Sequence, residues 1–117
     1  MPQVEQSLDI YQNANETIMI AVKDDNGDPM DLTLATGICW ILSKGDTEVA
    51  RYDLTDTELA IAAADSTDDG IQIELPSAVT GALTLGKLYR HQAWATINAK
   101  SKPVSEGDVT VLRGDGC

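Results

Sequence analysis

The chain has 117 residues, a formal net charge of −11 and 43% hydrophobic residues, with no phenylalanine. Such an acidic balance argues against binding to nucleic acid, which requires basic patches that displace counterions from phosphates. No apolar run approaches the roughly 20 residues needed to span a bilayer, and the N-terminus lacks the basic flank and apolar stretch of a secretory signal. We therefore expect one domain, residues 1–117, that folds in a cytoplasm and binds neither nucleic acid nor membrane.

The first half of the chain contains three segments with strand patterns. Hydrophobic residues alternate with polar or smaller ones over 17–23, which predicts a half-buried strand. Turn-forming residues fill 24–29 and include an Asn-Gly pair suited to positive φ. Residues 37–44 are apolar on both faces, as expected of a central strand. Residues 48–52 should return antiparallel to that strand.

Residues 55–65 are open to two interpretations. They begin with a capping box and are rich in alanine, both of which favour a helix. However, Leu59 and Ile61 alternate with alanine, and the segment is too short to be a stable helix by itself. We favour a short strand.

The closing third has the clearest pattern. Residues 71–75 alternate and run into a proline, which is tolerated in the first turn of a helix, so we expect one short helical turn near 76–82. Residues 88–99 can form a long strand, residues 100–103 a turn, and residues 109–111 the last strand. Seven to eight short strands at spacings near ten residues predict an all-β fold, an antiparallel β-sandwich.

A search for catalytic residues yields no enzyme signature. The only histidine, His91, lies in the middle of the predicted strand 88–99, where a structural or surface role is expected. No serine lies in a Gly-x-Ser-x-Gly elbow, and no glycine-rich phosphate loop leads from a strand into a helix. We therefore predict that the protein is not an enzyme and has no cofactor.

Metal and disulfide sites are not expected either. The acidic turn 24–28 fails the calcium-loop pattern because Pro29 stands where that pattern requires glycine and no glutamate closes the twelve-residue loop; Asp65, Asp68 and Asp69 form a second acidic turn. Cys39 lies in an apolar strand and is expected to be a small buried hydrophobic residue. Cys117 ends the chain and is expected to be exposed, so that both cysteines are free.

The charge is unevenly distributed. Residues 1–86 carry three basic and sixteen acidic side chains, whereas residues 87–117 carry five basic and three acidic ones. One interpretation is solubility. The other is electrostatic docking, in which the acidic part of one copy meets a basic strip on a neighbour.

The two tryptophans differ in their surroundings. Trp40 lies among apolar neighbours and is expected in the core. Trp94 lies in the core if its face packs inward, or on the surface if that face carries Arg90 outward. In the second case Lys87, Arg90 and Trp94 are the candidate protein-contact residues, because tryptophan often anchors interfaces. A sugar-stacking role for Trp94 is the alternative.

Several short motifs follow one another in a recognisable order. They are Asp31-Leu32-Thr33, Ser43-Lys44, the strand and turn from Gly70 to Ala78, Leu-x-x-Gly-x-x-Tyr from Leu83 to Tyr89, and Gly-x-Val-Thr-Val from Gly107 to Val111. In this order they resemble the small immunoglobulin-like domain of bacteriophage tail and baseplate proteins, including the N-terminal domain of the baseplate upper protein. The resemblance covers residues 8–113. It departs from the family at residues 13–16, where Arg/Lys-Gly-Asp/Asn is usual.

The resemblance implies an immunoglobulin-like sandwich that serves as a bacteriophage structural protein. Such a protein would be made in the host cytoplasm and would dock in the virion, in repeated copies, on the tail, neck or head–tail region. Its partners would be other virion proteins and copies of itself. Short terminal arms, residues 1–12 and 103–117, are expected to become ordered on docking. The alternatives are a capsid decoration protein and a carbohydrate-binding or adhesion module that binds a host-surface glycan.

Overall fold

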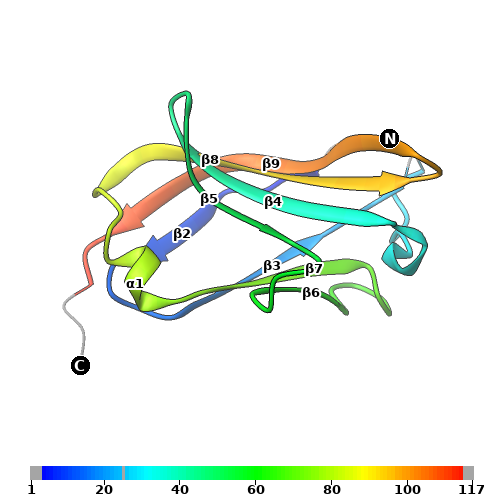
Figure 1. Cartoon of the computed structure of the whole chain (residues 1–117), viewed down its shortest axis with the longest axis horizontal. Coiled ribbons are helices and arrows are strands. Elements are labelled where there is room, and N and C mark those ends of the chain that lie inside the picture. Colours follow the sequence, from blue (N-terminus) through cyan, green and yellow to red (C-terminus); the bar gives the residue numbers. More distant parts are fainter. Residues whose placement is uncertain (1–3, 25, 115–117) are drawn as a thin grey trace.

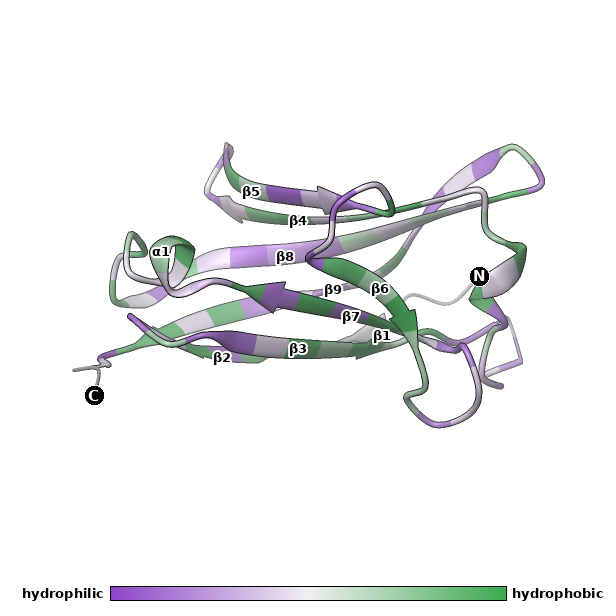
Figure 2. Ribbon diagram, turned by 60° about the horizontal axis from the view of Figure 1, so that its bottom comes forward, coloured by the Kyte–Doolittle hydropathy of each residue, from purple (hydrophilic) through white to green (hydrophobic). Residues whose placement is uncertain are grey.

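The computed structural model describes residues 4–24 and 26–114, which form two β-sheets packed face to face (Figures 1 and 2). The strands are β1 (Val4–Glu5), β2 (Leu8–Tyr11), β3 (Glu16–Ala21), β4 (Gly37–Lys44), β5 (Thr47–Asp53), β6 (Leu59–Ala62), β7 (Gly70–Leu75), β8 (Gly86–Ile97) and β9 (Lys100–Leu112). A 3₁₀ turn, η1 (Leu32–Leu34), and one short helix, α1 (Ser77–Thr80), complete the fold.

The strand order is that of an immunoglobulin sandwich. The small sheet runs β3-β7-β6, and the large sheet runs β9-β8-β4-β5 with β1 and β2 along the free edge of β9. These orders correspond to strands B-E-D and G-F-C-C′ of immunoglobulin variable domains. The predicted all-β sandwich is therefore confirmed. If β1 and β2 are counted as one interrupted edge strand, the described residues form eight strands.

One pairing departs from the antiparallel prediction. Both β1 and β2 run parallel to β9, with Val4 opposite Ser105 and Leu8 opposite Val109. A parallel partner is possible here because the whole domain lies between these strands in the sequence and supplies the long connection that parallel pairing requires.

The core lies between the sheets, and the alternation read from the sequence accounts for it. In β3, β4 and β8, buried positions alternate with partly or fully exposed ones. The largest fully buried side chains include Trp40, Ile10, Ile20, Leu32, Leu42, Ile71, Ile73 and Leu75. The predicted strand character of residues 55–65 is confirmed by β6, and the predicted helical turn by α1.

The corner at α1 is fastened to the start of β3. The Asn15 side chain accepts a hydrogen bond from the Ser77 backbone N–H at 2.9 Å, and the Thr80 hydroxyl donates to the Ala14 carbonyl at 2.7 Å. The next turn is closed by Tyr89, whose hydroxyl accepts from the Thr84 N–H at 2.8 Å. This last contact has the form of the tyrosine corner of immunoglobulin folds. Residues 13–16, where the sequence departs from the family motif, thus anchor the chain segment that connects the two sheets.

The last hairpin differs from the prediction. The turn is Asn98-Ala99 rather than residues 100–103, and β9 begins at Lys100 and pairs with β8. Residues 103–112, which were expected to belong to a terminal arm, therefore lie within the large sheet, as do residues 8–11 of the other expected arm. Residues 1–3 and 115–117 lie outside the described residues.

The backbone conformation of the Asn98-Ala99 turn leads to a prediction about stability. Both residues have positive φ, 54° and 62°, as a two-residue type I′ hairpin requires. A left-handed backbone is unfavourable for alanine and free for glycine. We expect Ala99→Gly to raise the free energy of unfolding by about 1 kcal/mol, measured by urea denaturation. Ala60→Gly, at an exposed strand position, is the control and should lower it; a loss of stability in both variants would contradict the turn assignment.

A second stability prediction concerns Ser105. Its hydroxyl is buried and has no hydrogen-bond partner among the described residues. Because an unpaired buried hydroxyl is costly, Ser105→Ala should raise the free energy of unfolding by about 1 kcal/mol. The matched control is Thr80→Val, which removes a buried hydroxyl that does have a partner and should be destabilising. Equal effects of the two substitutions would show that Ser105 is in fact hydrogen-bonded.

Candidate interaction surfaces

The only histidine of the chain belongs to the core. His91 is 1% exposed, and its Nδ1 atom lies 3.3 Å from Nε1 of Trp40, which donates to it. Its Nε2 atom lies 2.6 Å from the Gln6 carbonyl oxygen. Since the Trp40 N–H is only a donor and the carbonyl only an acceptor, the imidazole must be neutral with its proton on Nε2. His91 is therefore a structural residue, one of the two roles expected from the sequence.

Gln6 connects this pair to both sheets. Its backbone N–H donates to the Glu106 carbonyl at 2.8 Å, and its side chain donates to the Met19 carbonyl of β3, also at 2.8 Å. A Cβ atom at Gly107 would lie 1.9 Å from the Gln6 carbonyl oxygen, so only glycine permits this approach. The first strand is thus held by a specific set of polar contacts.

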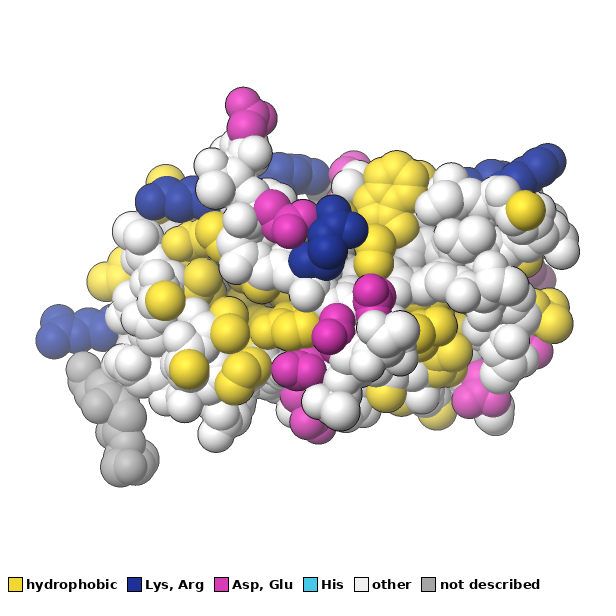
Figure 3. Space-filling model, in the orientation of Figure 1, with side chains coloured by type: hydrophobic (Ala, Val, Ile, Leu, Met, Phe, Trp, Pro, Cys, Tyr) yellow, Lys and Arg dark blue, Asp and Glu magenta, His cyan; other side chains and the backbone are white. Residues whose placement is uncertain are grey.

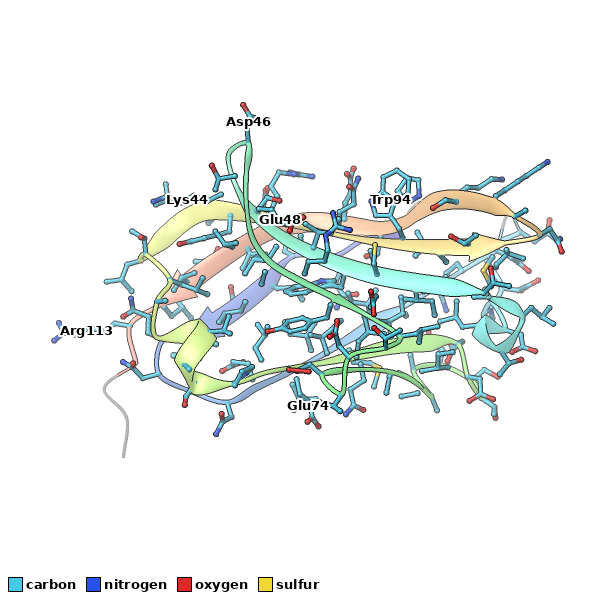
Figure 4. All side chains as sticks on the ribbon, viewed as in Figure 1. Lys44, Asp46, Glu48, Glu74, Trp94 and Arg113 are labelled. Carbon is cyan, nitrogen blue, oxygen red and sulfur yellow. The ribbon has the colours of Figure 1, made fainter. Side chains whose placement is uncertain are left out.

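The outer face of the large sheet carries Trp94. The indole lies on the side of β8 away from the small sheet, half-buried, and its Nε1 donates to the Gln92 side chain at 2.8 Å (Figure 4). The residues directly opposite Trp94 on the neighbouring strands are Cys39 of β4 and Pro103 of β9. A shallow hollow of about 190 Å³ lies beside the indole. Ile41 lies on β4 opposite Gln92 and extends this apolar surface. We call the surface formed by Trp94, Cys39, Pro103 and Ile41 the Trp94 face.

Arg90 lies on this same side of β8, four positions from Trp94. Its guanidinium contacts Asp108 at 2.7 Å and Glu106 at 3.7 Å, both on β9. Its charge is therefore compensated within the chain. Lys87 is exposed at the start of β8, roughly 20 Å along the strand from Trp94 at the usual rise per residue. The structure thus places Arg90 and Trp94 on the same side of β8, roughly 13 Å apart along the strand, and leaves Lys87 at the far end.

Cys39 corrects one expectation. It faces outward on β4 and is only partly buried, because Trp40 takes the inward position beside it. Burial raises the pKa of its thiol, with nearby acidic groups acting in the same direction and Arg51 opposing. Cys39 therefore contributes apolar surface beside Trp94. Cys117 lies outside the described residues. Sequence reasoning did not find Cys39 or Pro103 as neighbours of Trp94, because cross-strand register is not visible in one strand's pattern.

In both acidic turns, backbone N–H groups of the turn itself donate hydrogen bonds to an aspartate side chain. The Asp24 side chain accepts from the N–H groups of Asn26 and Asp28 at 2.9 and 3.0 Å. Burial opposes ionisation of Asp69, but hydrogen bonds from the backbone N–H groups of Ala64, Ser66 and Asp65 outweigh it and hold the pKa of its carboxyl below the usual range. Within residues 4–24 and 26–114, no three His, Cys, Asp or Glu side chains are grouped so as to hold a metal ion.

No family model matches the chain, and no curated protein is significantly similar to it. In the part of the chain that the structure describes, no helix is long and apolar enough to cross a membrane.

The buried histidine predicts a pH dependence of stability. Burial lowers the pKa of the His91 imidazole below its ordinary 6.5, with Arg90 acting in the same direction and the hydrogen bond to Gln6 opposing. The unfolded chain therefore takes up a proton near pH 6.5 that the native chain does not. Stability should be complete above pH 6.5 and should fall below it, by at most about 1.4 kcal/mol per pH unit.

Urea denaturation at pH 7.5 and 5.5 measures this effect. The control is His91→Gln, which is less stable at both pH values but has no imidazole to titrate. The wild-type chain should lose more stability than the variant between the two pH values. An equal loss in both would contradict a neutral, buried His91.

Proposed function

We propose that this protein is a structural component of a bacteriophage virion that docks in repeated copies through the Trp94 face. Two findings support the proposal. The motif order of the sequence resembles bacteriophage tail and baseplate domains, and the chain folds into the sandwich that this resemblance implies. The observation that carries the choice of face is the half-exposed Trp94 with apolar neighbours on both adjacent strands.

The Trp94 face suits a protein partner for physical reasons. Tryptophan contributes a large apolar area and a polar N–H, and such residues often supply most of an interface's binding energy. On one side of the Trp94 face, Arg90, Glu106 and Asp108 form a charged rim in which one cation pairs with two carboxylates. An apolar centre with a polar rim is the usual arrangement of protein interfaces.

A glycan is the less favoured occupant of this face. The carboxylate nearest the hollow, that of Asp53, already accepts hydrogen bonds from the hydroxyl and N–H of Thr55, which lower the pKa of its carboxyl. The Trp94 N–H is also occupied, by Gln92. The hollow is also lined by the hydroxyl-bearing Thr96 and Ser101, so the preference for a protein partner rests on the apolar surface around Trp94.

The test is incorporation into particles. Phage particles made in host cells that express the chain are purified by density gradient, and the chain is quantified by mass spectrometry. It should be present at a fixed ratio to the other structural proteins. Truncating an interface tryptophan typically costs about 2 kcal/mol or more, so Trp94→Ala should lower incorporation at limiting concentration by tenfold or more. The control is Leu34→Ala, at a 69% exposed residue of η1.

Two results would contradict the proposal in different ways. If the wild-type chain remains in the particle-free fractions, the virion function is wrong. If the chain is incorporated and Trp94→Ala does not change its amount, the function stands but the docking face lies elsewhere.

A further inference from the structure

The β8–β9 hairpin carries two lysines at positions that belong to the inner face of the sheet. Lys102 is directly opposite Ala95, and Lys100 is directly opposite Ile97. Residues that face each other across two strands point to the same side, and Ala95 points into the sandwich, where it is 3% exposed. Both lysines are nevertheless exposed, because the hairpin reaches the end of the molecule (Figure 1).

These lysines line a pocket. It has a volume of about 300 Å³ and is lined by Met30, Ala95, Ile97, Asn98, Lys100 and Lys102. Among the described residues neither lysine has a carboxylate partner, whereas Lys23, Arg51 and Arg90 each form an ion pair. Lys44 and Lys87 likewise form no ion pair among the described residues, but Lys100 and Lys102 differ in that they share one pocket with apolar residues. We call this the lysine pocket.

An acidic groove lies toward the other end of the molecule, at the end of the small sheet next to α1. Its volume is about 510 Å³, and its lining includes Glu16, Glu58, Glu74 and Pro76 but no basic residue. The carboxylate of Glu58 accepts from the Thr57 hydroxyl and that of Glu74 from the Gln72 amide, and neither forms an ion pair among the described residues. Figure 3 shows acidic side chains gathered over β6 and β7, and basic side chains at the hairpin end as well as at other places on this face.

We propose that the lysine pocket of one copy docks on the acidic groove of the next copy. The lysines meet the three glutamates, and the apolar floor of the pocket receives the exposed Pro76. Charge complementarity selects this partner, since the rest of the chain is predominantly acidic and would repel the groove. The inference rests on the proposed function, because it says how repeated copies contact each other.

The contact is heterologous, so each copy uses both surfaces and the association propagates. It closes into a ring if the rotation between copies allows and forms a filament otherwise. It does not use the Trp94 face, which points away from the small sheet while Glu74 points to the opposite side of the molecule (Figure 4). Copies joined in this way can still dock on a common platform.

A charge-swap experiment with sedimentation velocity tests the contact. Lys100→Glu/Lys102→Glu makes both surfaces acidic, and Glu58→Lys/Glu74→Lys makes both basic, so each variant alone should be monomeric at concentrations at which the wild-type chain associates. An equimolar mixture should associate again, because each surface then meets its opposite. Both variants keep a net negative charge, so non-specific attraction cannot explain the recovery. Lys44→Glu/Lys87→Glu is the matched control and should associate more strongly than Lys100→Glu/Lys102→Glu.

Three results would overturn the inference. The first is a wild-type chain that stays monomeric up to about 1 mM, which corresponds to negligible affinity. The second is that the single variants associate like the wild-type chain. The third is that their mixture stays monomeric although circular dichroism shows both variants folded. Particle incorporation is measured separately. A chain that is incorporated but does not self-associate refutes this contact alone, whereas one that associates but is absent from particles refutes the virion function.

Discussion

The fold depends on a short chain of hydrogen bonds in the middle of the sandwich, from Trp40 through His91 to the Gln6 carbonyl. Immunoglobulin domains place a tryptophan on strand C against a disulfide, whose second cysteine follows the corner tyrosine by two residues. Here Trp40 lies on the strand equivalent to C, and His91 follows Tyr89 by two residues. A hydrogen-bonded imidazole thus occupies the position of that cysteine. Unlike a disulfide, which does not persist in a reducing compartment, a hydrogen-bonded contact of this kind does not depend on the redox conditions.

This core arrangement also decides what the surface presents. Because side chains alternate along β8, fixing His91 inward fixes Trp94 and Arg90 outward, on the free face of the large sheet. Gln6 holds the first strand parallel to β9, so the last strand is paired on both sides and is central rather than a free edge. The outer faces of both sheets and the two ends of the sandwich are then left for contacts with other molecules, and the proposed docking surfaces lie there.

The sequence predicted local structure well and long-range pairing poorly. The strands over residues 17–23, 37–44 and 71–75 and the helical turn near 76–82 follow from alternation and from proline, which are local signals. The hairpin turn was predicted at residues 100–103 instead of Asn98-Ala99, because Lys100 and Lys102 are of a type common in turns. In the structure they are strand residues at an end of the sheet that the small sheet does not cover. Cross-strand register, which brings Cys39 and Pro103 beside Trp94, and the pairing of β1 with β9 depend on residues far apart in the sequence. Trp94 and Arg90 could thus be named from the sequence, whereas Cys39 and Pro103 beside Trp94 could not, and Lys87 was named although it lies at the far end of the strand.

The central structural claim concerns the protonation state of the His91 imidazole, and NMR of the two ring nitrogens tests it most directly. In a ¹⁵N-labelled chain at pH 7, two-bond ¹H–¹⁵N correlations should show His91 neutral, with the proton on Nε2 and an unprotonated Nδ1 that accepts the hydrogen bond from the Trp40 indole. An imidazolium, or a neutral ring with its proton on Nδ1, would contradict the account, because neither form can accept that hydrogen bond.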